Sequence, residues 1–213
     1  MTDRDLLPKE LRTEYENMLA RFNDPLKQES FNLFVNFVES RTNYLTAPAS
    51  TKFHLSCKHG LLIHSLSVTS LMFDDKQANP LVYSDIPDDS IIVTGMFHDL
   101  GKAGLSLEDP YYLECEPTPR QKEFGFSPSQ PYKVNVSNDY THVSSGIFEH
   151  AHSSALMVAK FYSAANWDEL FSILIHDGTE KDTNKDYTFK ECKLQTLLHR
   201  ADLLSSKWVE TKE

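Results

Sequence analysis

The chain has 213 residues, 40% of them hydrophobic and 24% charged, which is the composition of a soluble globular protein large enough to bury a substantial core. Its 21 Lys and Arg residues and 31 Asp and Glu residues give a formal net charge of −10, and the lack of a dense basic run argues against a long nucleic acid as a partner. No apolar stretch approaches the roughly 20 residues that span a bilayer, and the polar, acidic start lacks the features of a signal peptide.

The first part of the chain is predicted to be helical. Apolar residues at three- and four-residue spacing predict an amphipathic helix over 5–21. Pro25 suits the first turn of a second helix. After a loop over 41–51, a third helix is predicted over about 58–73, and the segment 74–89, which contains two prolines, is predicted to be a connection.

A fourth helix over about 91–100 follows a run of residues that commonly cap helix N-termini, and Gly101 is placed to terminate it. From about 106 to 145 the sequence is rich in proline and irregular. Within that segment, the alternating run 132–136 before the turn-like Asn138-Asp139 predicts one small β-hairpin. A segment of this length in a compact domain is commonly a lid or a substrate-facing loop.

Helices are predicted to resume over about 147–163, 166–176 and 189–208. The predicted fold class is therefore all-α, a compact helical bundle with one long irregular loop around 106–145. We expect a single domain over 1–213, in which the helices of residues 1–50 pack on a core formed by about 55–208.

The most informative pair of residues is His98-Asp99, which ends an apolar run just before a glycine. His64 lies in the middle of the third predicted helix, where an imidazole must find a partner. Asp202 lies within an apolar helical face, and a buried aspartate is almost always paired or bound to a metal. Together these residues predict a metal site.

Two histidines and two carboxylates form a mixed nitrogen and oxygen donor set that suits Mn, Fe, Ni, Co, Zn or Mg. Such a set leaves coordination positions for water and a substrate oxygen, as a catalytic metal requires. The expected cofactor is therefore a divalent transition metal or Mg, as one or two ions.

At this point the sequence resembles the HD-domain superfamily of metal-dependent phosphohydrolases. The ordered residues His64, His98-Asp99 and Asp202 are similar to its four-part motif. The resemblance extends to three longer runs, which are similar to the H-G-L-L-x-H-S-L-x-V, H-D-L-G-K and L-H-x-A-D signatures of one branch. These runs are HGLLIHSLSV over 59–68, FHDLGK over 97–102 and LHRAD over 198–202.

The resemblance covers residues 55–208 and implies the compact HD-domain helical bundle. It implies that His64, His98, Asp99 and Asp202 bind the metal. Some branches of the superfamily add two histidines that bind a second metal or contact phosphate, and here their counterparts are His150 and His176. His152 is the alternative to His150, because residues two apart cannot share a helix face.

Several other residues have two readings each. His176 ends an apolar helix, so it belongs either to the active site or to a helix cap. Lys102 either approaches a phosphate, as in related phosphohydrolases, or is solvated at a helix C-terminus. His59 lies before His64 on the same predicted helix and is a candidate for the entrance of the site. Arg200 either contacts an anionic substrate or is solvated. His54, His142 and His199 are interpreted as surface or structural residues.

The expected function is metal-dependent hydrolysis of a phosphate ester, in a nucleotide or a similar small phosphorylated metabolite, by a cytoplasmic enzyme that binds no membrane. Lys102, His150 and His176 would stabilise the phosphoryl charge or protonate the leaving oxygen. Asp177 is a further candidate base, although an aspartate at a helix end is commonly solvated. Two alternatives stay open: a di-iron oxygenase of the HD type, and a non-catalytic module that binds a nucleotide or a regulatory partner.

Overall fold

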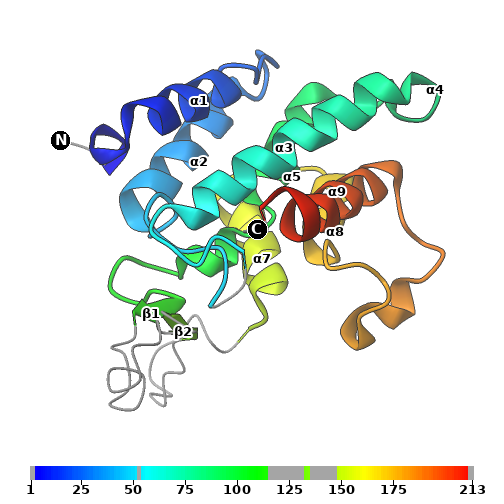
Figure 1. Ribbon diagram of the computed structural model, residues 1–213. Helices are drawn as coiled ribbons and strands as arrows, with labels where there is room; N and C mark the ends of the chain where they lie inside the picture. The colour runs from blue at the N-terminus through cyan, green and yellow to red at the C-terminus, as the bar shows by residue number, and fades with distance from the viewer. Residues whose placement is uncertain (1–2, 52–53, 115–131, 135–147, 211–213) are drawn as a thin grey trace.

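The computed structural model of the protein describes residues 3–51, 54–114, 132–134 and 148–210. Within them the fold is all-α, as predicted, and compact (Figure 1). The longer helices are α1 (Lys9–Leu19), α2 (Gln28–Arg41), α3 (Gly60–Ala78), α5 (Asp88–Phe97), α7 (His150–Phe161), α8 (Trp167–Leu174) and α9 (Lys193–Leu204). Shorter helical turns are η1 (Asp3–Leu6), α4 (Pro80–Tyr83), η2 (Leu100–Ala103), η3 (Asp182–Tyr187) and the π-helical turn η4 (Ser205–Val209).

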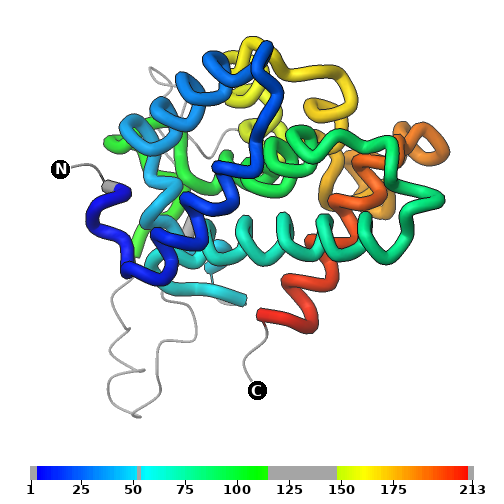
Figure 2. The backbone as a smooth tube through the Cα atoms, turned by 90° about the horizontal axis from the view of Figure 1, so that it is seen from above, coloured from blue at the N-terminus to red at the C-terminus, as the bar shows by residue number. Residues whose placement is uncertain are grey.

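Helix α5 lies at the centre of the molecule. It has no exposed polar face after its first residue: all of its residues from Asp89 to Phe97 are buried, the polar Asp89, Ser90 and Thr94 included. It packs against α3, α8 and α9, and Figure 2 shows α3 and α9 running past it. The C-terminal end of α5, which carries His98-Asp99, is therefore enclosed by other helices.

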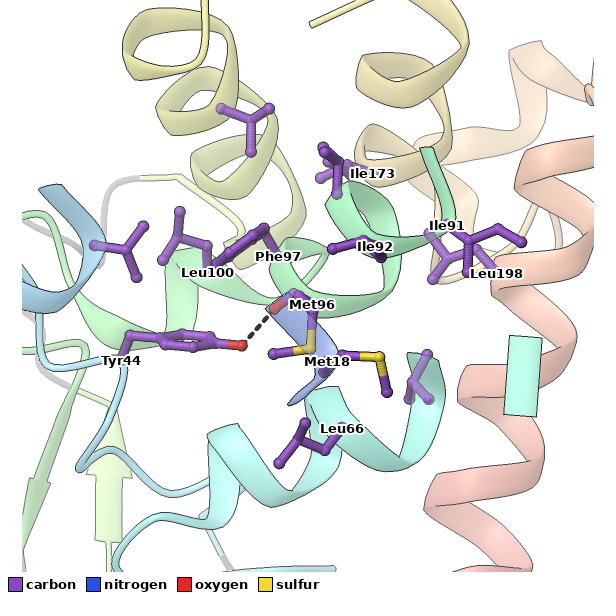
Figure 3. Packing of buried hydrophobic residues seen from close by; sticks show 14 of the residues in the cluster. Met18, Tyr44, Leu66, Ile91, Ile92, Met96, Phe97, Leu100, Ile173 and Leu198 are labelled. Atoms are coloured by element: carbon purple, nitrogen blue, oxygen red, sulfur yellow. Dashed lines mark hydrogen bonds between the residues drawn. The ribbon is translucent and has the colours of Figure 1, made fainter. Parts of the chain in front are cut away.

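The end of α5 is also held rigidly by aromatic packing. Figure 3 shows Met96, Phe97 and Leu100 inside the apolar cluster, where the ring of Phe97 lies 4.8 Å from that of Phe34. The hydroxyl of Tyr44 donates a hydrogen bond of 2.6 Å to the carbonyl of Met96 (Figure 3). The last carbonyls of a helix have no N–H partner within the helix. The bond from Tyr44 therefore gives the Met96 carbonyl a partner and stabilises the helix end next to His98.

Two predicted helix starts near the N-terminus are wrong, and each lies close to a proline. The helix predicted over 5–21 is divided into η1 and α1, because Pro8 takes an extended ψ of 139° and precedes the first turn of α1. The second helix begins at Gln28 instead of Pro25, which lies in a turn. Leu26, which follows Pro25, is 94% exposed, so it adds nothing to the core.

The segment 74–89 is more helical than predicted. Helix α3 continues to Ala78, and Pro80 then starts the short helix α4 at the position where its missing N–H costs nothing. Pro87 is the N-cap residue of α5, and no side chain caps this helix start. Asp89 instead accepts hydrogen bonds from the N–H groups of Asn23 and Asp24, which ties the start of α5 to the N-terminal region.

The predicted strand within 132–136 is present, but its partner precedes it. Strand β2 (Tyr132–Val134) pairs antiparallel with β1 (Tyr112–Glu114), with Tyr112 opposite Val134. The turn predicted at Asn138-Asp139 lies outside the described residues. The described helices include none that is both long and apolar enough to cross a membrane.

Helix α8 starts with a capping box, and this cap yields a stability prediction. The Asn166 side chain accepts from the N–H of Glu169, whose carboxylate accepts from the N–H of Asn166, both at 2.9 Å. We expect Asn166→Ala to cost about 1 kcal/mol of unfolding free energy, since one orphan donor of the helix loses its acceptor. The thermal midpoint should fall by about 2–4 °C, and an unchanged midpoint in calorimetry would contradict the role of the cap.

Candidate metal centre

His98 and Asp99 lie in the two-residue connection between α5 and η2. Helix α5 ends at Phe97, and the backbone turns into η2 at Leu100. The Nδ1–H of His98 donates to the carbonyl of Gly95 at 2.9 Å, which directs Nε2 inward. Gly101 permits a close approach here, because a Cβ at this position would lie 2.3 Å from the carbonyl oxygen of His150. The prediction that Gly101 terminates the helix is therefore wrong. Gly101 lies within η2 and lets this turn contact the start of α7.

Four residues form the first donor set: His64 from α3, His98, Asp99 through Oδ2, and Asp202 from α9. The Nε2 atom of His64 lies 3.3 Å from Nε2 of His98 and 3.2 Å from Oδ1 of Asp202. Asp99 Oδ2 lies 3.5 Å from each of these two imidazole nitrogens. His64, His98 and Asp99 are at most 1% exposed, so the donors face one another away from bulk water.

Three residues form the second donor set: Asp99 through Oδ1, His150 from the first turn of α7, and His176 just beyond α8. Asp99 Oδ1 lies 3.3 Å from Nε2 of His150 and 3.3 Å from Nε2 of His176. The two imidazole nitrogens are also 3.3 Å apart. Because the two oxygens of one carboxylate belong to different sets, Asp99 connects them.

The spacing of these donors fits metal ions. Ligand atoms about 2.1 Å from a shared ion are separated by about 3.0 Å in octahedral and about 3.4 Å in tetrahedral geometry. The separations of 3.2–3.5 Å in both sets fall near these values, apart from His98 Nε2 and Asp202 Oδ1 at 4.0 Å. The buried histidines and aspartates can therefore hold a metal ion.

Hydrogen bonding supports the same conclusion. His64, His98 and His176 each use Nδ1–H as a donor to another group, which leaves Nε2 with an unshared pair directed into the site when the ring is neutral. When His150 and His176 are neutral with their proton on Nδ1, the buried Oδ1 of Asp99 faces their two Nε2 atoms at 3.3 Å and has no donor among the described residues. Lone pairs that face one another repel unless a cation or proton lies between them, and a buried acceptor without a donor is costly.

The protein holds protons in the site when no metal does. Burial lowers the pKa of His64, but its hydrogen bonds to Asp202 and Glu210 outweigh burial and raise that pKa to about 9. The pKa of His176 is likewise raised to about 9, because burial is outweighed by the Asp99 carboxylate. Burial lowers the pKa of His98 to about 4 and that of His150 to about 3. The carboxylates thus favour the charged form of His64 and His176, and burial favours the neutral form of His98 and His150.

Lys102 is largely buried, which excludes the interpretation that it is a solvated lysine at a helix C-terminus. Its Nζ lies 2.5 Å from Asp99 Oδ2, and its side chain is only 13% exposed. The charge of Asp99 outweighs burial and raises the pKa of Lys102, so the ammonium persists throughout the neutral range. Lys102 therefore places a permanent positive charge beside the carboxylate that connects the donor sets.

His176-Asp177 repeats the local geometry of His98-Asp99. The Nδ1–H of His176 donates to the carbonyl three residues earlier, that of Ile173, at 2.8 Å. Asp177 lies 3.8 Å from Nε2 of both His150 and His176, and an ion pair of 2.7 Å with Lys181 holds it there. Asp177 is 26% exposed, so it borders the second donor set on the side that solvent reaches.

Other histidines lie around the centre without joining the two donor sets. His59 binds the carbonyl of Leu45 through Nδ1, and His152 has a buried Nδ1 without a partner among the described residues. His199 donates to the carbonyl of His176 at 2.8 Å, in line with a structural role. His142 lies outside the described residues. Arg200 pairs with Asp75 at 3.3 Å.

Glu210, which no sequence pattern singled out, and His54, which was interpreted as a surface or structural residue, both lie next to His64. Glu210 follows the last predicted helix, yet both of its carboxylate oxygens lie 3.0 Å from Nδ1 of His64. The His54 ring lies 5.2 Å from that of His64, and its Nε2 is 4.0 Å from Glu210. No sequence spacing signals either contact, because each depends on how the chain folds back. The chain has no match among protein-family models, curated proteins or solved structures.

Proposed function

We propose that this protein is a cytoplasmic metal-dependent phosphohydrolase of the HD-domain type, acting on a phosphate ester of a nucleotide or a similar small phosphorylated metabolite. The observation that carries the proposal is the arrangement of His64, His98 and Asp202 on one side of Asp99 and of His150 and His176 on the other. Asp99 would bridge two divalent ions, one in each donor set.

The resemblance of three sequence runs to the HD-domain signatures supports the same proposal. All three contribute to the centre: 59–68 through His64, 97–102 through His98-Asp99, and 198–202 through Asp202. Bound divalent ions supply Lewis-acid polarisation of a phosphoryl oxygen and activation of water. The donor chemistry, nitrogen and carboxylate oxygen without thiolate, suits Mn, Fe, Co, Ni, Zn or Mg.

The chain's own residues would contribute binding and charge stabilisation. Lys102 supplies a positive charge that would stabilise a phosphoryl oxygen next to Asp99. His150 is 18% exposed, in contrast to the fully enclosed His98, so it faces the side from which a substrate can enter. Asp177 borders the same side and would accept or pass on a proton there.

A phosphate-release assay tests the proposal. Metal-free protein would be reloaded with Mn²⁺, Mg²⁺, Co²⁺ or Ni²⁺ and tested on a panel of nucleoside mono-, di- and triphosphates and cyclic nucleotides. We expect metal-dependent turnover of at least one class. Nucleotide binding without turnover under every metal would favour the non-catalytic module instead. Turnover that is unchanged by chelators would contradict the proposal.

The di-iron oxygenase remains a second candidate because one carboxylate connects two donor sets made of histidine and carboxylate. Such a site also suits a pair of iron ions. The two functions are separated by purifying the protein from iron-supplemented cells and measuring its metal content and electron paramagnetic resonance spectrum. Two irons per chain with a mixed-valence signal and no phosphate release would favour the oxygenase.

A further inference from the structure

Glu210 and Asp202 contact the same imidazole from opposite sides. Asp202 Oδ1 lies 3.2 Å from Nε2 of His64, while the two oxygens of Glu210 lie 3.0 Å from Nδ1. Both acids belong to the C-terminal end of the described chain, where α9 carries Asp202 and the π-helical turn η4 ends just before Glu210. Turns of this type are rare and commonly occur at functional sites.

The carboxylate of Glu210 is buried and oriented. Its side chain is only 3% exposed, although it lies next to the C-terminal end of the described residues. The hydroxyl of Ser205 donates to it at 2.5 Å, and that hydroxyl also lies 2.7 Å from the hydroxyl of Ser67 on α3. A buried carboxylate is costly unless it is paired. Glu210 is paired with Nδ1 of His64 and with the Ser205 hydroxyl, and its Oε2 lies 4.0 Å from Nε2 of His54.

His64 needs such a partner because of where it lies. His98 and His176 lie just beyond helix ends, and each donates Nδ1–H to a carbonyl of the preceding turn. His64 is the fifth residue of α3, where the carbonyls of the preceding turn already accept bonds within the helix. Its Nδ1–H therefore requires an acceptor from elsewhere in the fold, and Glu210 is that acceptor.

We infer that Glu210 is a positioning residue for the metal centre, which holds His64 with its Nδ1–H bound and its Nε2 directed at the first donor set. The inference rests on the proposed metal centre and assigns Glu210 no contact with substrate. A carboxylate on the second nitrogen of a metal-bound histidine orients the ring and strengthens it as a donor, and loss of such a partner costs about 10- to 100-fold in metal affinity.

The experiment compares Glu210→Gln with Glu210→Asp and with a matched control, Glu14→Gln. Glu14 is an exposed glutamate on α1, a helix that contributes no residue to the site. Zn²⁺ affinity and stoichiometry are measured by competition with a chelator. The Nδ1–H proton of His64 is followed by nuclear magnetic resonance in the Zn²⁺-loaded protein and assigned with a His64→Asn variant.

We expect Glu210→Gln to weaken one Zn²⁺ site by about 10-fold or more and to leave the other unchanged. The Nδ1–H resonance should move upfield, because a neutral acceptor forms a weaker hydrogen bond than a carboxylate. Glu210→Asp should recover part of both effects, and Glu14→Gln should match the wild type. Circular dichroism and thermal melting show whether each variant is folded.

Three results would overturn the inference. The first is a folded Glu210→Gln variant with the affinity and the Nδ1–H resonance of the wild type. The second is an additional ion in the wild type that Glu210→Gln loses, since Glu210 would then be a ligand and not a partner of His64. The third is a wild type that binds no metal, which would also refute the proposed function. Wild-type protein that binds metal but releases no phosphate would refute the hydrolase alone and leave the role of Glu210 intact.

Discussion

Replacement of Asp99 with asparagine or alanine is expected to reduce phosphate release on the order of 10³-fold or more, equivalent to about 4 kcal/mol of transition-state stabilisation. Asp99 offers one oxygen to each donor set, so a single substitution weakens both. His176 of the second set also groups with His98 and Asp202 of the first, but it does so through a single ring, whereas Asp99 offers a different oxygen to each set. Asp99→Asn keeps the shape of the side chain but removes its charge and replaces one of its two ligand oxygens with an NH2 group.

Metal content measured on the same samples tests the bridging role directly. Asp99→Asn should lose affinity at both ions, whereas Asp202→Asn should weaken the first donor set and His150→Gln the second. Asp74→Asn is the matched control, because Asp74 is an exposed aspartate on α3. Phosphate release that survives Asp99→Ala would refute the proposed mechanism.

Loss of Asp99 also leaves Lys102 buried without its partner. An unpaired buried charge destabilises a protein by several kcal/mol, so a drop in activity could reflect unfolding. The double variant Asp99→Asn with Lys102→Met removes both charges. If the double variant regains the thermal stability of the wild type but not its metal content, the loss of metal binding follows from the missing carboxylate and not from unfolding.

The second large effect is that metal binding should strengthen steeply between pH 6.5 and 9. The pKa values of His64 and His176 are about 9 in the metal-free protein, so each ring must release a proton before Nε2 binds an ion. Apparent affinity therefore rises by about tenfold per pH unit for each proton released. Isothermal titration in buffers of different ionisation enthalpy counts these protons.

Stability of the metal-free protein should change in the opposite direction. A pKa raised from 6.5 to about 9 stabilises the folded state fully below pH 6.5, and this stabilisation is lost as the pH rises towards 9. Each histidine contributes on the order of 3 kcal/mol. We expect the chelator-treated protein to melt earlier at pH 8.5 than at pH 6.5, and the metal-loaded protein to show a smaller decrease or none. Equal melting of the metal-free protein at both pH values would contradict the pKa values.

Local sequence patterns were sufficient to predict the main helices and to single out His64, His98, Asp99 and Asp202, whose side chains the fold brings together. Helices α5, α7, α8 and α9 each lie within or close to a predicted range, because apolar periodicity reflects which helix face is buried. The helix boundaries were less predictable. Helix α1 begins only after Pro8, and α2 begins three residues after Pro25. Helix α3 continues through polar residues to Ala78 because its last turns contain no glycine or proline.

The pairing of the donors was not predictable from the sequence. His150 and His176 were candidates for a second metal, but only the contact of η2 with α7, which Gly101 permits, places His150 opposite Asp99. The division of Asp99 between two donor sets likewise depends on the orientation of one side chain. Distances between residues far apart in sequence follow from the packing of whole helices, which no local pattern encodes.

The types of residue in the centre can thus be recognised in the sequence, since His98-Asp99 at a helix end and Asp202 on an apolar face each require a partner. The roles of the residues around them cannot be recognised in the same way. The Lys102 ammonium and the Glu210 carboxylate look like ordinary surface charges in the sequence, yet the fold buries both against metal-ligand candidates. Burial is a property of the assembled tertiary structure. An ion pair on the surface contributes little to the free energy of folding, whereas a buried charge must be paired, and its pairing fixes the neighbouring side chain.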